Sequence, residues 1–367
     1  MHQFLLPGDA APWFRGALVD SNPSFVFDVM GGRPVVMLFM GSAQYPGVVE
    51  AMRHIADNRR LFDDIQASFF GIVIDPADAE QGRVKPYKPG IRYFVDADRS
   101  ISRAYRAVEE RDGQERYFPH WVLLDSTLRV VDTAPLEAGD RIIAALKALI
   151  DEPEPQAPVL TVPRVFEPEL CRLLIKNYEA NGGTDSGFMR EENGITVARI
   201  DHSHKRRSDW LIKDEKLQAA LGARLTRFLL PVVQRAFQFT ATRVERYVVS
   251  CYDGETGGHF RAHRDNTTAG TAHRRFACTI NLNPGEYDGG DLRFPEFGKR
   301  TYRAPLGGAV IFSCSLLHEA TPVTRGRRYA FLPFLYDESG AALRESNKHL
   351  LDPERRNFMD APADAAT

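Results

Sequence analysis

The first 170 residues of this 367-residue chain contain no cysteine. Its four cysteines lie at positions 171, 251, 278 and 314, without any paired spacing. A disulfide framework needs paired thiols in an oxidising compartment, so this usage indicates buried thiols in a reducing compartment instead. It also excludes, for the N-terminal part of the chain, any chemistry that depends on a thiolate nucleophile.

Long apolar runs and long basic tracts are missing as well. No stretch of eighteen apolar residues occurs, which excludes a membrane-spanning helix. The first residues show no basic region followed by a long apolar stretch, so we expect no secretory signal and a cytoplasmic location. The formal net charge is −2, and we therefore expect neither nucleic acid nor a membrane as a partner.

Prolines gather at one place in the chain and predict a domain boundary there. They occupy positions 153, 155, 158, 163 and 168, where they favour extended backbone and prevent a helix. A length of 367 residues also exceeds the usual size of one domain. We predict a first domain over 1–152, a Pro-rich linker over 153–165, a second domain over 166–345 and a C-terminal tail over 346–367.

The first domain alternates apolar strand-like runs with helical patterns. Strands are predicted at 35–40, 69–75 and 93–96, helices at 48–65, 101–107 and 141–150, and a hairpin-like pair at 121–124 and 128–131. Such β-α-β alternation, ending in a hairpin and a helix, is typical of a small α/β layer fold.

Residues 95–105 (VDADRSISRAY) and 119–125 (PHWVLLD) of this domain resemble the later strands and helix of thioredoxin-fold domains of the peroxiredoxin kind. The loop in which that family keeps its reactive thiolate reads Gly-Ser-Ala-Gln-Tyr-Pro-Gly here, over 41–47. The domain is therefore predicted to be redox-inactive. Docking, substrate presentation and homodimerisation through this domain are the alternatives for its role.

The second domain combines one long helix with many short strands. Apolar residues recur at helical spacing from Leu217 to Val233, with Pro231 as a predicted kink. Strand-like runs follow at 244–251, 276–282, 292–295, 309–313 and 329–336, separated by Gly, Asn and Pro. This pattern predicts an all-β barrel or roll, whose mouth brings together the ends of strands that are distant in sequence.

Four residues of this domain indicate a metal centre. His263 and Asp265 lie two residues apart on extended backbone, so their side chains point to the same side and both can bind one ion. His318 follows 53 residues later, and Arg328 ten residues after that. Two histidines and one carboxylate form the facial-triad pattern of non-haem Fe(II) oxygenases, with a guanidinium suited to the carboxylate of a co-substrate.

From about residue 161 to 336 the chain resembles the iron- and 2-oxoglutarate-dependent oxygenases of the prolyl 4-hydroxylase type, whose core is a double-stranded β-helix (jelly roll). The resemblance is carried, in order, by 166–171 (FEPELC), 252–265, 279–283 (TINLN), 289–295 (GGDLRFP) and 317–329. It implies that His263, Asp265 and His318 hold Fe(II), and that Arg328 pairs with the C5 carboxylate of 2-oxoglutarate.

The resemblance also suggests residues around these four. Tyr252 stands where the family often lines the co-substrate pocket with tyrosine. Asn281 departs from the family pattern, because the family commonly has a tyrosine at this position. Thr279 shares a strand face with Asn281, so both are candidates for the same pocket. His259 and Arg261, just before His263, are candidates for the substrate side.

The resemblance implies a hydroxylase that consumes O2 and 2-oxoglutarate, releases succinate and CO2, and relies on ascorbate to keep its iron reduced. Its substrate could be an amino-acid residue of a peptide or protein, with prolyl residues as one option, or a free amino acid or other small metabolite. Because related halogenases replace the carboxylate ligand with a small residue, Asp265 favours hydroxylation.

Two other functions remain open for the jelly roll. One is a non-catalytic metal-binding sensor or interaction module. The other is a metal-dependent enzyme that does not use 2-oxoglutarate, and Arg328 is the residue that distinguishes the 2-oxoglutarate-dependent oxygenase from it. Three residues compete with the assigned ones. His202 and His204 form another His-x-His pair, for which a solvated loop is the favoured interpretation, and Arg327 competes with Arg328 for the co-substrate.

Overall fold

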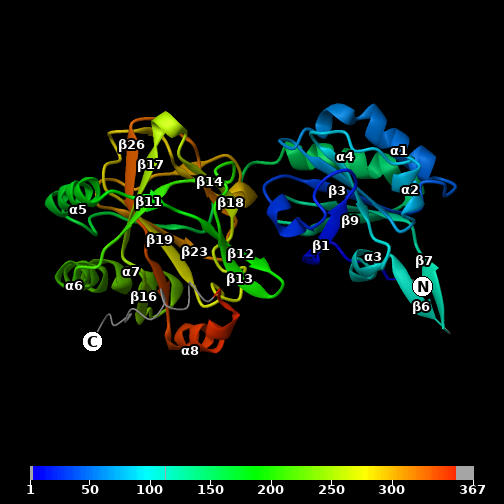
Figure 1. Ribbon diagram of the computed structural model, residues 1–367. Coiled ribbons are helices and arrows are strands. Elements are labelled where there is room, and N and C mark those ends of the chain that lie inside the picture. Colours follow the sequence, from blue (N-terminus) through cyan, green and yellow to red (C-terminus); the bar gives the residue numbers. More distant parts are fainter. Residues whose placement is uncertain (1–2, 112, 353–367) are drawn as a thin grey trace. The chain divides into compact units, whose positions relative to one another are not determined.

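The computed structural model describes residues 3–111 and 113–352 (Figure 1). Contacts divide the chain into two compact units. One runs up to Gln156 and includes Pro295–Lys299; the other comprises Ala157–Phe294 and the chain from Arg300 onward. Along the described residues, no helix is both long and apolar enough to cross a bilayer.

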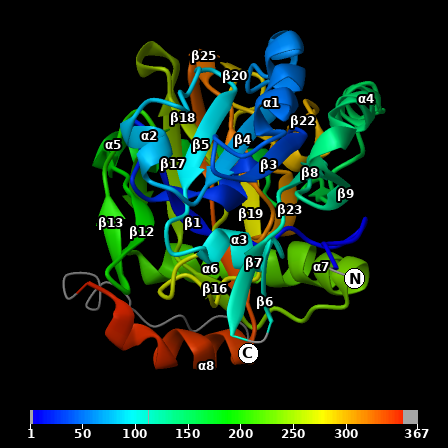
Figure 2. The same ribbon diagram turned by 90° about the vertical axis from the view of Figure 1, so that its right-hand side faces the viewer.

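The N-terminal unit is built on a seven-stranded sheet with the order β2-β1-β5-β4-β3-β8-β9. The central strands β3, β4 and β5 are parallel, and they lie side by side in Figure 2. The strands of the sheet are β1 (Arg15–Leu18), β2 (Phe25–Val26), β3 (Val35–Gly41), β4 (Ser68–Val73), β5 (Ile91–Val95), β8 (His120–Leu124) and β9 (Val130–Pro135). A separate hairpin joins β6 (Val108–Arg111) to β7 (Gln114–Tyr117).

Each face of this sheet buries its own apolar cluster. Helices α1 (Val48–Asp57) and α4 (Gly139–Ile150) cover one face, where Trp121 and Ile142 are fully buried. Ile101 from α3 (Ser100–Ala104) packs with Phe94 on the other face. A short helix α2 (Ala77–Glu80) follows β4. The predicted α/β layer architecture is thus present.

Helix α1 is shorter than predicted. The predicted helix over 48–65 ends at Asp57 and gives way to a 3-10 turn, Arg59–Leu61. The carboxylate of Asp63 then accepts hydrogen bonds from the backbone N–H groups of Ile65 (2.8 Å) and Gln66 (2.7 Å). Such local bonds offer the backbone an alternative to helix, and apolar spacing alone does not reveal them.

The C-terminal unit consists of two sheets folded over each other, as predicted for a double-stranded β-helix. The larger sheet has the order β10-β23-β19-β26-β17-β15-β11, with β16 and β27 beside it, and the smaller has the order β14-β18-β24-β21-β22. Strands of the larger sheet are β10 (Leu160–Val162), β11 (Thr184–Asp185), β15 (Ser208–Leu211), β16 (Arg243–Glu245), β17 (Val248–Asp253), β19 (Phe276–Asn281), β23 (Ala309–Ser313), β26 (Arg327–Phe331) and β27 (Phe334–Tyr336).

The remaining strands belong to the smaller sheet and to two separate pairs. The smaller sheet contains β14 (Lys205–Arg206), β18 (His259–His263), β21 (Leu292–Arg293), β22 (Thr301–Tyr302) and β24 (His318–Ala320). The pairs are β12 (Phe188–Glu192) with β13 (Ile195–Arg199), and β20 (Asp288–Gly289) with β25 (Val323–Arg325).

Helices cover the outer face of the larger sheet. Apolar residues of α5 (Pro168–Asn181), α6 (Glu215–Arg224) and α7 (Leu230–Phe237) form one buried cluster with residues of β17, β19 and β26. The long helix predicted over 217–233 is present, but Leu225–Leu229 form a π-helical turn between α6 and α7. Pro231, which has no N–H to donate, lies in the first turn of α7 and accounts for this local widening.

Several boundaries differ from the prediction. The run over 244–251 is split into β16 and β17 at Arg246, whose φ is 52°. The run over 329–336 is likewise split into β26 and β27, and Pro333 lies between them. Part of the predicted linker, residues 160–162, is strand β10, which pairs with β23.

The chain beyond the predicted end of the second domain also packs on that domain. Helix α8 (Glu338–Ser346) continues into a 3-10 turn (Lys348–Leu350), and the buried Leu351 pairs with Thr196. The predicted tail therefore belongs to the fold as far as residue 352. Its remainder, residues 353–367, lies outside the described residues.

The buried cluster beneath the helices leads to a stability prediction. Leu221 on α6 is fully buried in it, whereas Leu306 is 41% exposed. Leu221→Ala should destabilise the C-terminal unit by about 2–5 kcal/mol because it removes buried methyl groups and leaves a cavity. Calorimetric unfolding of the full chain checks this, with Leu306→Ala as the control that should stay within about 0.5 kcal/mol of wild type. Equal effects of the two substitutions would contradict the packing described.

Candidate metal centre and co-substrate pocket

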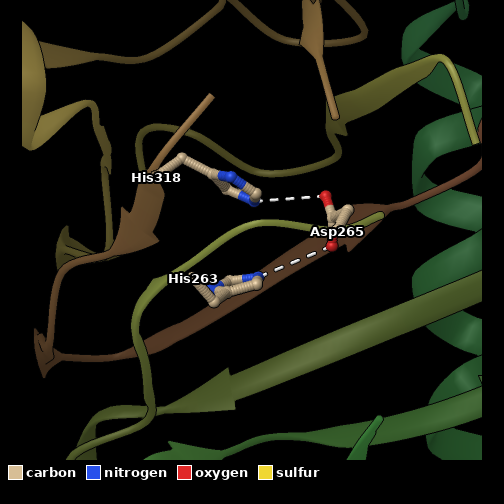
Figure 3. A group of neighbouring side chains, drawn as sticks. All are labelled: His263, Asp265 and His318. Atoms are coloured by element: carbon tan, nitrogen blue, oxygen red, sulfur yellow. Dashed lines mark ion pairs between the residues drawn. The ribbon is translucent and has the colours of Figure 1, made fainter. Parts of the chain in front are cut away.

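Strand pairing brings together the two histidines that the sequence analysis singled out. In the antiparallel pair of β18 and β24, His263 lies directly opposite His318. Asp265 follows two residues after the end of β18, and its backbone N–H donates to the carbonyl of Cys314 (2.9 Å), which holds this loop near β24. Figure 3 shows the three side chains facing one another.

The distances within this group fit an ion held between the side chains. Nε2 of His263 lies 3.6 Å from Oδ1 of Asp265, and Nε2 of His318 lies 3.3 Å from Oδ2. The three possible ligand atoms all lie within 4.8 Å of one another. These separations are long for hydrogen bonds but close to the roughly 3 Å expected between neighbouring ligands of one metal ion.

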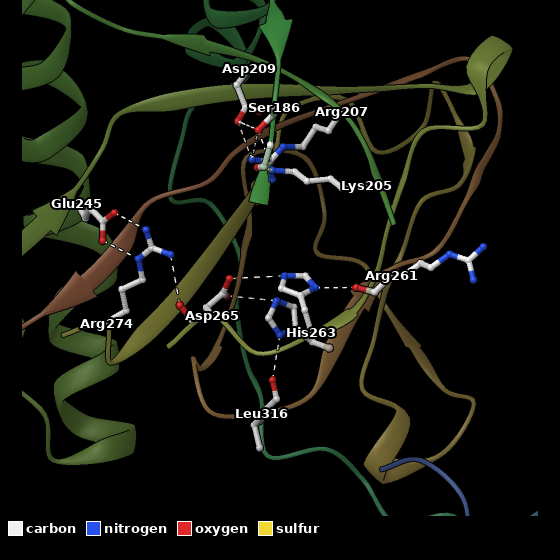
Figure 4. A network of polar contacts seen from close by, with 12 residues as sticks. Ser186, Lys205, Arg207, Asp209, Glu245, Arg261, His263, Asp265, Arg274 and Leu316 are labelled. Carbon is white, nitrogen blue, oxygen red and sulfur yellow. Dashed lines mark hydrogen bonds and ion pairs between the residues drawn. The ribbon is translucent and has the colours of Figure 1, made fainter. Parts of the chain in front are cut away.

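Backbone carbonyls orient both imidazoles. Nδ1 of His263 lies 2.7 Å from the carbonyl oxygen of Arg261, and Nδ1 of His318 lies 3.0 Å from that of Leu316 (Figure 4). A carbonyl can only accept, so each Nδ1 carries a proton, and in a neutral imidazole the nitrogen that faces Asp265, Nε2, is then the one with the free lone pair. This is the tautomer that a metal ligand requires.

The charge states suit a cation as well. Burial, together with the neighbouring His318, lowers the pKa of His263 to about 4, so its imidazole is neutral at pH 7. Burial alone would raise the pKa of Asp265, but His318 and His263 lower it well below its usual value. The group therefore offers at least the neutral nitrogen of His263 and the carboxylate of Asp265 as ligands with no proton to displace.

Arg328 lies in a separate pocket of the jelly roll. It stands on β26 opposite Tyr252 of β17, is 2% exposed, and has its guanidinium carbon 4.9 Å from the Tyr252 ring. Within the described part of the chain, its Nε has no hydrogen-bond partner. An arginine buried without an acceptor is costly, which indicates a site for an anion. Residues around this pocket include Thr279, Asn281, Tyr287, Tyr302, Val310 and Arg328.

The sequence analysis missed Tyr287 in this pocket. Tyr287 is 2% exposed, and no hydrogen-bond partner of its hydroxyl is found among the described residues. Asn281 does line the pocket, but its amide donates to the carbonyl of Ala304 (2.8 Å). The signal for Tyr287 lies three residues further on, at Gly290. A Cβ on Gly290 would lie 3.1 Å from Cδ of Arg328 and 3.6 Å from Cε2 of Tyr287, so this glycine lets the two side chains meet.

Other candidate residues lie outside the metal group. The ring of His259 is bound through Nδ1 to the carbonyl of Gly257 (2.8 Å). The side chain of Arg261 is exposed and points away from the triad in Figure 4, where its carbonyl is what contacts His263. His202 pairs with Asp185 (2.7 Å), and His204 packs edge-on against Phe188.

The side chains of Arg327 and Arg328 lie on opposite faces of β26, as expected for consecutive residues of a strand. Arg327 is exposed and binds Asp253 (2.9 Å), whereas Arg328 on the opposite strand face is buried. The structure thus leaves Arg328, and not Arg327, facing the pocket.

Each of the two units matches a known protein family. Residues 247–336 match the 2OG-Fe(II) oxygenase superfamily, and residues 7–132 match the AhpC/TSA family. A PKHD-type hydroxylase of Nitrosomonas europaea is 37% identical over 156 residues, covering 38% of this chain and 68% of the relative. A PKHD-type hydroxylase of Synechococcus sp. (strain JA-3-3Ab) is 29% identical over 141 residues, covering 36% of this chain.

The chain therefore belongs, through its C-terminal unit, to the 2OG-Fe(II) oxygenase superfamily and within it to the PKHD-type hydroxylases. It spans 59% of the length of the Synechococcus relative. Among solved structures, it is similar to a prolyl hydroxylase from Trichoplax adhaerens in complex with a hypoxia inducible factor peptide fragment. That likeness has 18% identity and a TM-score of 0.41, and covers 51% of this chain and 86% of the other.

The geometry of the triad predicts how metal binding responds to substitution. Asp265→Asn keeps the shape of the side chain but removes the only carboxylate of the group, so we expect the affinity for Mn(II) or Fe(II) to fall by more than about 100-fold. Equilibrium titration of the full chain with Mn(II) measures it. His259→Ala, on the same strand but outside the group, should bind the metal like wild type. Unaltered affinity in Asp265→Asn would rule out this metal site.

Proposed function

We propose that the protein is an Fe(II)- and 2-oxoglutarate-dependent dioxygenase that hydroxylates an unactivated C–H bond and releases succinate and CO2. The observation that supports this most directly is the joint presence of the His263, Asp265 and His318 group and a buried arginine without an acceptor in a neighbouring pocket. A metal site alone would fit many functions. The pocket around Arg328, whose buried guanidinium is suited to an anion, is what favours a 2-oxo acid as co-substrate.

In this proposal, His263, Asp265 and His318 hold Fe(II), which supplies the activation of O2 when it is bound. Three protein ligands leave positions free for the 2-oxo acid and for O2. Arg328 binds the C5 carboxylate through its planar fork, and Tyr287 donates its hydroxyl to the same group. Tyr252 packs beneath the guanidinium, while Thr279 and Asn281 form the wall of the pocket.

The substrate is proposed to be an amino-acid residue in a peptide or protein, with prolyl residues as one option, or a free amino acid or another small metabolite. Ascorbate is proposed as the reductant that keeps the iron ferrous. The N-terminal unit presents substrate, docks a partner or forms a homodimer in this proposal. A cytoplasmic location is supported by four cysteines that are all buried and unpaired.

Succinate formation tests the proposed reaction. Iron-loaded protein incubated with 2-oxoglutarate and O2 should release succinate even without the true substrate, through uncoupled turnover. His263→Ala and His318→Ala each remove a metal ligand and should reduce that release by about 100-fold or more. His259→Ala is the matched histidine control. Metal binding without any succinate would instead support the metal-binding sensor or interaction module.

Substitutions of Arg328 and of Tyr287 should both raise the apparent KM for 2-oxoglutarate, and that of Arg328 should raise it more. Arg328→Ala removes the buried cation and should raise the apparent KM for 2-oxoglutarate by about 30-fold or more. Tyr287→Phe removes one hydroxyl donor to a charged acceptor and should raise it by roughly 10-fold.

Steady-state kinetics measure both values, and Tyr302→Phe provides the control. Tyr302 also lines the pocket, but its hydroxyl accepts a hydrogen bond from the backbone N–H of Ala157 (3.0 Å), which ties it to the chain, so its removal should raise the KM for 2-oxoglutarate less than the removal of the Tyr287 hydroxyl. A normal KM in Arg328→Ala would refute the co-substrate assignment.

A further inference from the structure

A second polar region lies beside the triad, further along the inward face of β17. On this strand, Val249 and Cys251 point outward into the apolar cluster beneath the helices. Tyr252 and Ser250 alternate with them and point inward, and Arg246 precedes β17 with the same parity. Figure 4 shows part of this region around Asp265: Ser186, Lys205, Arg207 and Asp209 form one group, and Glu245 with Arg274 form another.

In the group of Ser186, Lys205, Arg207 and Asp209, only one of the two cations has a carboxylate partner within the group. Arg207 is 5% exposed and pairs with Asp209 (2.6 Å), whose other oxygen accepts from Ser250 (2.6 Å). Lys205 is 4% exposed, and among the described residues its Nζ donates only to neutral oxygens, those of Ser186 (2.8 Å) and Gly187 (2.5 Å). Burial lowers the pKa of Lys205 well below its usual value, which shows how little compensation this ammonium has.

The second group is fully paired. Arg274 binds Glu245 through two parallel hydrogen bonds (2.7 and 2.6 Å), and His273 lies 2.9 Å from the same carboxylate. Another nitrogen of Arg274 donates to the backbone carbonyl of Asp265 (3.3 Å). The group is therefore in direct contact with the loop that carries the carboxylate of the triad.

Arg246 adds a cation for which the described residues provide no carboxylate partner. Its guanidinium carbon lies 4.6 Å from the ring centre of Phe334, and that of Arg274 lies 4.0 Å from the same ring. Its Nε is buried without an acceptor among the described residues, and its backbone has a φ of 52°. Burial, with repulsion from Arg207 and Arg274, lowers the pKa of Arg246 to about 10.

An unpaired guanidinium in this position destabilises the free protein. Asp209 pairs with Arg207 and Glu245 pairs with Arg274, so among the described residues no carboxylate forms an ion pair with Arg246. Arg246 is only partly exposed and its Nε is buried, so its charge is incompletely solvated, a cost that a neutral residue would avoid. A ligand that brings one negative charge would offset this cost.

We propose that Arg246, supported by Lys205, forms a carboxylate-binding subsite next to the metal centre, and that the substrate of the enzyme carries a carboxylate. The inference rests on the proposed function in so far as the ligand is the molecule to be hydroxylated. A guanidinium fork matches a carboxylate, which can accept two parallel hydrogen bonds from it. Both a free amino or organic acid and an acidic group of a peptide provide this chemistry.

A first experiment needs no turnover. Acetate is the probe and acetamide its neutral counterpart, with thermal unfolding of the full chain as the measurement at constant ionic strength. At 100 mM, acetate should raise the Tm by roughly 2 °C more than acetamide. This difference should be at least halved in Arg246→Gln and should persist in Arg328→Gln. Arg172→Gln, which removes a charge from an exposed pair on α5, is the matched control and should behave like wild type.

Two outcomes of the acetate experiment would contradict the proposed subsite. If acetate does not stabilise wild type, or if its effect disappears in Arg328→Gln but not in Arg246→Gln, the carboxylate does not bind at Arg246. The ligand-free Tm of Arg246→Met adds an independent criterion. It should equal or exceed that of wild type, because an unpaired buried cation is replaced by an apolar chain of similar length. A Tm several degrees lower would show that Arg246 is structural.

A second experiment identifies the source of the carboxylate. Succinate release is measured with the capped probes Ac-Pro-OH and Ac-Asp-Pro-NH2 and with their neutral counterparts Ac-Pro-NH2 and Ac-Asn-Pro-NH2. Stimulation by Ac-Pro-OH alone indicates a free acid, and stimulation by Ac-Asp-Pro-NH2 alone indicates an acidic peptide. The effective probe should lose at least 10-fold in apparent affinity in Arg246→Gln. Equal stimulation by acids and amides would refute the inference, whereas absence of succinate with acetate binding intact would refute only the proposed function.

Discussion

The pairing of β18 with β24 is the interaction on which the candidate centre depends. It places His263 opposite His318 although 55 residues separate them in the sequence, and the loop after β18 then brings Asp265 between them. Side chains on a strand alternate, so a shift of one residue in this register would turn one imidazole away from the other. The other features of the centre follow from this register. The two carbonyls that orient the rings belong to residues two positions before each histidine: Arg261 lies within β18, and Leu316 lies in the turn that leads into β24.

The interior of the jelly roll is organised by charge as much as by packing. The outer face of the larger sheet is apolar and packs beneath three helices, whereas its inward face carries Arg207, Asp209, Ser250, Tyr252 and Arg328. Each buried carboxylate of that interior lies against at least one cation or imidazole, but not each cation has a carboxylate. Such an imbalance lowers the stability of the free protein. It is the pattern expected where a protein gives up some stability in order to bind anions, and it supports the proposals that anions bind at Arg328 and at Arg246.

How much the sequence could predict differed from residue to residue. His263, Asp265, His318 and Arg328 could be found because residue type, strand alternation and order along the chain all point to one chemistry. Tyr287 and Arg246 could not, because what distinguishes them is the absence of a hydrogen-bond or charge partner, and partners come from segments far away in sequence. The break between β16 and β17 was missed for a related reason. Residues 244–251 form a continuous strand pattern, and only the tertiary environment holds Arg246 at a positive φ. Helix α1 was predicted too long because an aspartate turn, not apolar periodicity, determines its end.

Gly290 shows how little room the co-substrate pocket leaves for sequence change. Its φ is 66°, a conformation that other residues seldom adopt, and a Cβ there would lie 2.7 Å from Val323 and 3.1 Å from Arg328. Even the smallest mutation at this position, to alanine, would strain the backbone and push against the guanidinium at once. An evolving chain could thus exchange many residues of the barrel wall, yet any lineage that lost this glycine would have to rebuild the surroundings of the buried Arg328.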